Sequence, residues 1–384
     1  MNKKEIAEIK KQFCAERCTI DRICSCYVDG EKNIRTTMRE AFLSMPEEEI
    51  FKYFNIFRKA LSGHLGKNLL NLEFLMEEEA AGGKMDFLLR LRDSKLSNEY
   101  MLDEFYRKVI ENYFCPGNYY IILIHGTYDI PGKASDGSEM FDASEEVYEY
   151  LLGCICPVKL SKAGLAYQPK ENRVENRIQD WVVEEPLHGF LFPAFNDRQT
   201  DIHGMLYSAR KAEELQPDFM ESMFGCPVQL SAGSQKDAFH TLIADVLGEG
   251  AGYEEVADIY EHLEELAVEV QDSPDPVQLS REDVRRLFEE CGVSEEKMET
   301  FDRMYAAAVG NGSLTLQNIA CGRRFRIETP DVKIEVAPDR LDLVEARFID
   351  GKECLVVTVN DRVEVDGMNV RTIGMGGLEN EENV

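Results

Sequence analysis

The sequence lacks a long hydrophobic run and lacks a secretory signal. Its longest apolar stretches, residues 119–124 and 150–155, are far shorter than the run of about 20 residues that a membrane-spanning helix needs. Residues 1–8 (MNKKEIAE) mix charged and apolar side chains and contain none of the apolar core of a signal peptide. We therefore expect a cytoplasmic protein that does not enter a membrane.

The sequence also lacks the local signatures of several common enzyme classes. It contains no G-x-S-x-G nucleophile elbow, no H-E-x-x-H zinc motif and no phosphate-binding P-loop. It has no C-x₂-C pair of the kind that marks a zinc knuckle. No reaction is therefore indicated by a motif, and we expect no cofactor.

What the sequence has in excess is negative charge. It carries 72 Asp and Glu against 43 Lys and Arg, which gives a formal net charge of −29. Residues 245–304 alone hold 19 acidic and 5 basic residues. A charge of this sign repels phosphate backbones and anionic lipid surfaces, so neither nucleic acid nor a membrane surface is an expected partner.

The remaining composition is that of a globular protein. Hydrophobic residues make up 44% of the chain and aromatic residues 9%, which is enough to build cores despite the high charge. The 11 cysteines form an odd number and accompany no export signal, so we expect them to be free thiols in a reducing cytoplasm.

Helical periodicity and strand alternation follow one another along the chain, which predicts an α+β fold. Asp29-Gly30 favours a tight hairpin turn, because both central residues of such a turn need positive φ. Pro116-Gly117 marks another turn, after which an apolar run is typical of a buried strand. The predicted elements are helices at 3–18, 46–63 and 98–114, strands at 19–28, 32–37, 119–125 and 147–156, and a hairpin over 189–208.

These elements group into a mixed α+β domain with antiparallel strands, an acidic helical insertion and a C-terminal β-meander. The predicted bounds are 1–230 for the first domain, 231–320 for the acidic helical region, 321–372 for the meander and 373–384 for a disordered tail. The meander either packs on the first domain or stands apart from it, and the sequence leaves both arrangements open. It does not indicate an oligomeric state.

The acidic region contains a predicted helix at 254–270 with a row of like charges. Its members, spaced at i, i+4, i+7 and i+11, are Glu254, Asp258, Glu261 and Glu265. Like charges at this spacing cost about 0.2–0.5 kcal/mol per pair, so the row does not serve the stability of the helix. It is either a solvated face or a docking face for a basic protein partner. The favoured function is a non-enzymatic interaction protein that uses this face.

A cluster of cysteines near the N-terminus raises the question of a metal site. Cys14 and Cys18 fall at i, i+4 in a predicted helix, and Cys24 and Cys26 fall at i, i+2 in a predicted strand. Four thiolates that converged from these two faces would suit tetrahedral zinc. Neither spacing is that of a zinc knuckle, and cysteine is also a common core residue. Buried thiols are therefore the favoured interpretation.

The alternative function is a cytoplasmic enzyme, such as a hydrolase. Its site would lie near His125, Asp129 and His203, which follow or flank predicted strands. A histidine beside carboxylates can act as a general base, provided that the side chains come within hydrogen-bond reach of a common point.

Three segments of the sequence together resemble a known family. They are residues 18–33 (CTIDRICSCYVDGEKN), 192–211 (FPAFNDRQTDIHGMLYSARK) and 334–353 (IEVAPDRLDLVEARFIDGKE). They resemble an uncharacterised family of cytoplasmic bacterial proteins, a domain of unknown function known mainly from Gram-positive anaerobes, over nearly the whole chain. The resemblance implies a cytoplasmic bacterial setting and leaves the function and the site residues open.

Overall fold

The chain divides into two compact units in the computed structural model, Met1–Asp237 with Ser273–Val277, and Ala238–Asp272 with Gln278–Val384. The tail predicted at 373–384 lies outside the described residues. No described helix is long and apolar enough to span a membrane. The structure describes all residues except 134–138, 141–145, 227–229, 249–250, 272, 274, 311, 321–323, 361–362, 366–367 and 371–384.

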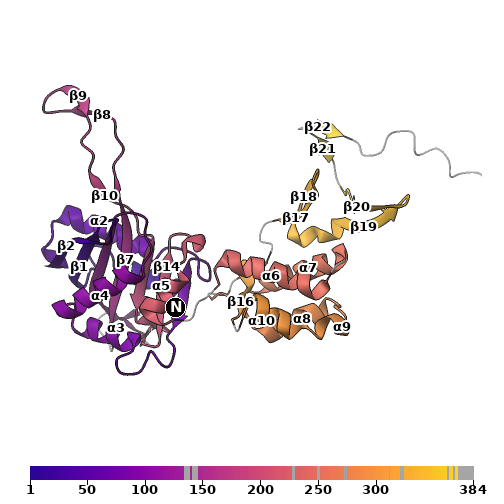
Figure 1. Cartoon of the computed structure of the whole chain (residues 1–384), viewed down its shortest axis with the longest axis horizontal. Helices are drawn as coiled ribbons and strands as arrows, with labels where there is room; N and C mark the ends of the chain where they lie inside the picture. The colour runs from indigo at the N-terminus through magenta and orange to yellow at the C-terminus, as the bar shows by residue number, and fades with distance from the viewer. Residues whose placement is uncertain are drawn as a thin grey trace, which may run out of the picture. The chain divides into compact units, whose positions relative to one another are not determined.

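The first unit is built on a large antiparallel sheet (Figure 1). Its strand order is β2-β1-β4-β7-β11-β14-β3, and β10 pairs with the end of β7. Each of these pairs is antiparallel, which confirms the predicted α+β fold with antiparallel strands. The strands are β1 (Ile20–Val28), β2 (Ile34–Ala41), β3 (Leu69–Glu73), β4 (Tyr119–Ile130), β7 (Glu146–Leu160), β10 (Trp181–Val183), β11 (His188–Phe192) and β14 (Gly204–Ala209).

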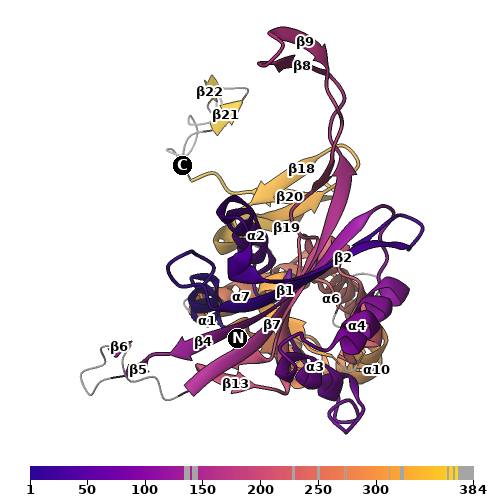
Figure 2. The ribbon, with the colours of Figure 1, turned by 90° about the vertical axis from the view of Figure 1, so that its left-hand side faces the viewer.

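Helices cover both faces of this sheet (Figure 2). In β4, Ile121 and Leu123 belong to the apolar cluster on one face, while Ile122 and Ile124 belong to the cluster on the other. Burial on both sides explains the continuous apolar run of this strand. The elements on one face are α1 (Lys3–Lys10), η1 (Phe42–Ser44) and α2 (Glu47–Ala60), and those on the other are α3 (Lys84–Asp93), α4 (Glu99–Asn112) and α5 (Pro217–Phe224).

Two turns of the first unit show how local chemistry sets the path of the chain. After β1, the Asp29 carboxylate accepts hydrogen bonds from the backbone N–H groups of Glu31 and Asn33, each at 2.9 Å. Between β12 (Ala194–Asn196) and β13 (Gln199–Asp201), Asp197 and Arg198 have φ of 50° and 58°. Two successive positive φ values are those of a type I′ turn, which is common in two-residue hairpin loops, and this turn lies within the predicted hairpin over 189–208.

The helix predicted at 3–18 is shorter than expected. It begins after the cap residue Asn2, whose side chain accepts from the backbone of Lys4 and Glu5, and it ends at Lys10. Phe13 is nevertheless buried, because the turns that follow the helix bring it into the same apolar cluster as Ile9. Phe13 therefore contributes to the core from outside the helix.

A long two-stranded arm extends from the sheet beyond the paired ends of β7 and β10 (Figure 1). Its tip is the hairpin of β8 (Leu165–Gln168) and β9 (Arg173–Asn176). Several large apolar side chains along the arm are exposed, including Ile178 and the only tryptophan of the chain, Trp181. The first unit also contains the short pair β5 (Gly132–Lys133) and β6 (Glu139–Met140) and the 3₁₀ helix η2 (Ala212–Glu214).

The second unit contains helices around an aromatic and aliphatic core. Phe239, Leu263, Phe288 and Phe301 are buried in it. The helix predicted at 254–270 is α7. The elements are α6 (Ala232–Leu247), whose first residues belong to the first unit, α7 (Tyr253–Glu269), β15 (Gln278–Leu279), α8 (Arg281–Glu290), α9 (Glu295–Met298), α10 (Phe301–Ala308), β16 (Leu314–Thr315) and α11 (Leu316–Ile319).

The described C-terminal strands form separate two-stranded hairpins where the sequence predicts one meander. Asp350 and Gly351 have φ of 49° and 77°, so the chain turns back tightly between one such pair. The pairs are β17 (Phe325–Glu328) with β18 (Lys333–Val336), β19 (Val344–Ile349) with β20 (Lys352–Val357), and β21 (Val363–Val365) with β22 (Met368–Val370), and η3 (Pro338–Leu343) precedes β19.

Candidate functional site

The three residues predicted for a hydrolase site lie apart. His125 is buried on β4, Asp129 is exposed further along the same strand, and His203 is exposed just before β14. Three strand spacings separate β4 from β14, which amounts to roughly 14 Å. The structure therefore does not bring these side chains to a common point. The convergence that a hydrolase site would need does not occur.

Each histidine instead contacts a carboxylate that the sequence did not connect with it. His125 Nδ1 lies 2.8 Å from Asp21 Oδ2, and His203 Nδ1 lies 2.9 Å from Glu79 Oε1. Burial lowers the pKa of His125, although Asp21 opposes this shift. The hydrogen bond to Glu79 raises the pKa of the exposed His203. These are separate local pairs and do not form one site.

The four N-terminal cysteines also fail to converge. Because α1 ends at Lys10, Cys14 and Cys18 do not share a helix face. Cys24 and Cys26 belong to the apolar cluster on one face of the sheet, whereas Cys18 packs against the cluster on the other. Burial raises the pKa of Cys24 to about 11 and that of Cys26 to about 12, so both are protonated thiols. In the described part of the chain, no group of three or more His, Cys, Asp or Glu is placed to hold a metal ion.

The acidic row of α7 is exposed along its whole length. Its buried side is formed by Ala257, Ile259, Tyr260 and Leu263. The opposite side carries the four predicted partner-binding residues, all of them exposed: Glu254, Asp258, Glu261 and Glu265. The helix thus keeps its apolar and acidic residues on separate sides, as its periodicity predicts.

The acidic row borders a hollow between α7 and the end of α8. The hollow has a volume of about 390 Å³, and Asp258, Glu261 and Glu265 line it together with Glu290 of α8. His262 also lines it, with Nε2 3.2 Å from Glu290 and Nδ1 3.9 Å from Glu265. Glu254 lies one turn before the hollow and is not part of its lining.

A cysteine in the wall of this hollow responds to its negative charge. Cys291 follows α8 and is half-buried. Burial, and next to it the carboxylates of Asp258, Glu290 and Glu265, raise the pKa of the Cys291 thiol to about 11. The electrostatic effects of these carboxylates therefore add at the Cys291 thiol. A row of charges spread along a flat surface would act less strongly on a single group.

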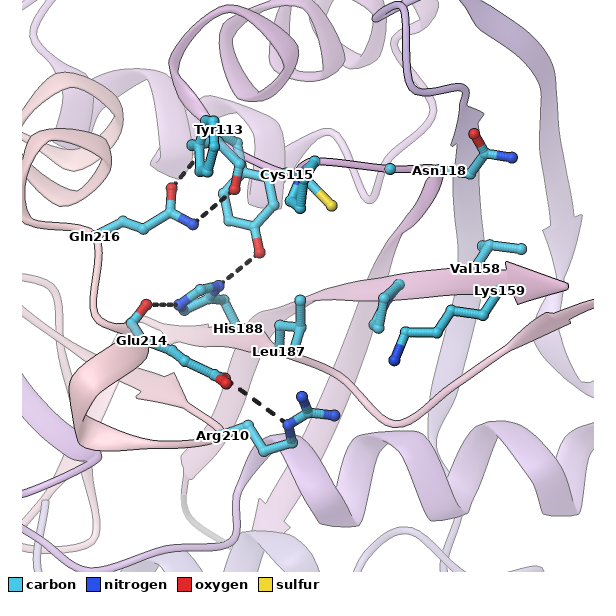
Figure 3. A pocket seen from close by; sticks show the side chains of 14 residues that line it. Tyr113, Cys115, Asn118, Val158, Lys159, Leu187, His188, Arg210, Glu214 and Gln216 are labelled. Atoms are coloured by element: carbon cyan, nitrogen blue, oxygen red, sulfur yellow. Dashed lines mark hydrogen bonds and ion pairs between the residues drawn. The ribbon is translucent and has the colours of Figure 1, made fainter.

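The structure contains a second cavity, in the first unit, that the sequence did not indicate. It has a volume of about 460 Å³ and lies where α4 and the C-terminal part of β7 end (Figure 3). Tyr113 and His188, which meet at its inner side, are 75 residues apart in the chain. No local spacing connects them, and the only nearby signal in the sequence was the turn at Pro116-Gly117.

Both ring nitrogens of His188 are engaged at the floor of this cavity. Nε2 lies 2.8 Å from the backbone carbonyl of Glu214, so it must carry the hydrogen and donate it. Nδ1 lies 2.7 Å from the Tyr113 hydroxyl, which donates to it in the neutral ring. Burial lowers the pKa of His188 to about 4. The His188 ring is thus neutral and hydrogen-bonded at both nitrogens.

Comparison with known proteins identifies the family of the chain. No curated protein matches the chain significantly. The family model described as Domain of unknown function (DUF4317) matches residues 1–368, nearly the whole chain. The chain therefore belongs to the DUF4317 family, a domain of unknown function.

Proposed function

We propose that this protein is a non-enzymatic interaction protein that binds a basic segment of a partner protein. It binds this segment on its acidic face, which consists of the acidic row of α7 and Glu290 of α8. The observation that carries the proposal is the hollow of about 390 Å³ around which Asp258, Glu261, Glu265 and Glu290 lie together. A hollow of this kind can hold a lysine or arginine side chain in contact with several carboxylates at once. A flat row of charges would attract such a side chain without enclosing it.

The charges of the hollow are not neutralised by nearby cations. Among the described ion pairs, His262 is the only basic side chain that approaches Glu265 or Glu290, and one imidazole does not offset the four carboxylates that line the hollow. A partner's guanidinium or ammonium group would add charge-assisted hydrogen bonds there. It would also relieve the repulsion between carboxylates on successive turns of α7.

The alternative hydrolase function has less support. It depends on His125, Asp129 and His203 acting together, and these side chains lie on different parts of the sheet. His188, which lies beside the cavity of the first unit, is neutral and already uses both ring nitrogens. A general base needs a free ring nitrogen within reach of the proton that it removes.

The proposal places the protein in the cytoplasm of a bacterium, as the family resemblance suggests. Its support is the state of the cysteines, because the ten described cysteines are all free thiols. Free thiols in such number are typical of a reducing compartment.

The test compares how much of a partner protein the wild type and a charge-reversed variant retain. We expect that immobilised wild-type protein retains a basic protein from a lysate of the source cell, and that Glu261→Lys with Glu265→Lys loses it. The retained amount should also fall as salt is added, because exposed charge pairs are screened. Recovery is measured by quantitative mass spectrometry of the eluted proteins.

A matched control distinguishes the loss of the acidic face from a general change in net charge. Glu40→Lys with Glu111→Lys makes the same change in charge at two exposed positions of the first unit. This control should retain the partner as the wild type does. Equal recovery by the two double variants would show that the acidic face has no specific role, provided that both keep the circular dichroism spectrum of the wild type.

A further inference from the structure

The cavity beside His188 has the size and the walls of a small-molecule site. Its volume of about 460 Å³ is in the range of about 300–1,000 Å³ that such sites occupy. Most of its wall is apolar, and the side chains that provide it come from the loop after α4, from β7 and from the segment before β11: Phe114, Pro116, Pro157, Val158 and Leu187. A ligand that fills the cavity must therefore have an apolar body.

The polar atoms at the inner side of the cavity are already used. His188 is hydrogen-bonded at both ring nitrogens, to Tyr113 and to the carbonyl of Glu214. Gln216 donates to the carbonyl of Phe114 and accepts from its N–H, at 2.8 and 2.9 Å. These bonds satisfy His188, Tyr113 and Gln216 without help from a ligand, so the part of a ligand that lies against these three side chains needs no polar group.

The rim, in contrast, offers positive charge. In Figure 3 the charged ends of Lys159 and Arg210 lie on the opposite side of the pocket from Gln216. Lys159 is paired with Glu184 at 2.8 Å, whereas the closest carboxylate oxygen to Arg210, on Glu214, is 3.8 Å from Nε. That distance is too long for a hydrogen bond. Glu214 lines the same cavity and offsets part of the Arg210 charge, but no other described side chain bonds the guanidinium, so its N–H donors are left for a ligand.

We propose that this cavity binds a small organic anion with an apolar body, such as an aromatic or medium-chain carboxylate. The apolar body packs against Phe114, Val158 and Leu187, and the anionic end pairs with Arg210 at the rim. The planar guanidinium can bind both oxygens of a carboxylate or two oxygens of a sulfonate, which fixes the orientation of the ligand as well as its affinity. The site belongs to the first unit and does not depend on the acidic face of the second.

The probe is 8-anilino-1-naphthalenesulfonate, which joins an apolar ring system to one sulfonate. We expect its fluorescence to rise saturably on the full-length protein, and its affinity to fall about tenfold in Arg210→Gln, because a charge-assisted hydrogen bond is lost. The matched control, Arg177→Gln, removes the same charge from an exposed position on the arm and should bind the probe as the wild type does. Equal binding by the two variants, or non-saturable binding to the wild type, would overturn the proposal.

A thiol in the wall of the cavity gives a second readout that needs no variant. Cys115 lines the cavity and is half-buried, and Cys354 in the second unit is a half-buried thiol for comparison. The bound probe should slow alkylation of Cys115 by N-ethylmaleimide and leave the rate at Cys354 unchanged, as followed by peptide mass spectrometry. The uncharged parent compound, N-phenyl-1-naphthylamine, should protect Cys115 less at equal concentration. Failure of the sulfonate to protect Cys115, or equal protection by the parent compound, would contradict the proposed site.

Discussion

His188 should make the first unit sensitive to mild acid. The ring is 3% exposed, and burial lowers its pKa from the ordinary 6.5 to about 4. As the pH falls below 6.5, the unfolded chain binds a proton at this position while the folded protein does not. The stability that the neutral ring contributes is therefore fully present above 6.5 and is lost as the pH falls towards 4.

The size of the effect follows from the two pKa values. Between about pH 7.5 and about pH 5, the difference in proton binding lowers the free energy of unfolding by about 2 kcal/mol. The structural reason is that a second ring proton would require the Tyr113 hydroxyl to turn and accept, which leaves the hydroxyl hydrogen without an acceptor in a buried place.

The assay is urea unfolding at both pH values, followed by near-UV circular dichroism. Most of the fully buried tyrosines lie in the first unit, so the signal reports mainly the loss of packing in that unit. Glutamine does not titrate in this range, so His188→Gln should lose about 2 kcal/mol less free energy of unfolding than the wild type when the pH is lowered. The variant should be less stable than the wild type at neutral pH. The exposed His64→Gln should behave as the wild type. If His188→Gln and the wild type lose equal stability in acid, the assignment of the acid sensitivity to His188 is wrong.

Two further predictions concern other parts of the molecule. A Cβ at Gly153 of β7 would lie 2.1 Å from the Phe190 ring of β11, so Gly153→Ala should lower the free energy of unfolding by about 1–3 kcal/mol. Urea unfolding of the single and double variants should show that Phe190→Leu relieves part of this loss, and simple addition of the two losses would contradict the contact. In the acidic hollow, Glu265→Gln with Glu290→Gln should lower the pKa of Cys291, so that its alkylation rate rises at a lower pH. Glu295→Gln, which changes an exposed carboxylate of α9, should leave that pH profile unchanged.

Much of the fold was predictable because it depends on local patterns. The apolar run of β4 and the helical stripes of α2 and α4 place these elements close to their observed bounds. The acidic row was also predictable, because residues four apart on one helix must share a face. The hollow beside it was not, since it requires Glu290 of α8 to lie next to α7.

The histidine sites show why the rest could not be predicted. Asp21, the partner of His125, is 104 residues away along the chain, and Tyr113, the partner of His188, is 75 residues away. These pairs exist only because β1 lies beside β4 and because α4 ends over β11. A single sequence contains the side chains but not the strand order that brings them together.

The strand order also bears on how the protein folds during synthesis. The edge strand β3 ends at Glu73, but its partner in the large sheet, β14, begins at Gly204. A ribosome that adds about 5–20 residues per second needs on the order of ten seconds to make the chain between them. Until β14 has been made, β3 and the helices that follow it have no completed sheet to pack against. Their apolar side chains stay exposed and can contact other chains. Slower growth at low temperature, or a chaperone that covers this segment, should therefore raise the yield of folded protein.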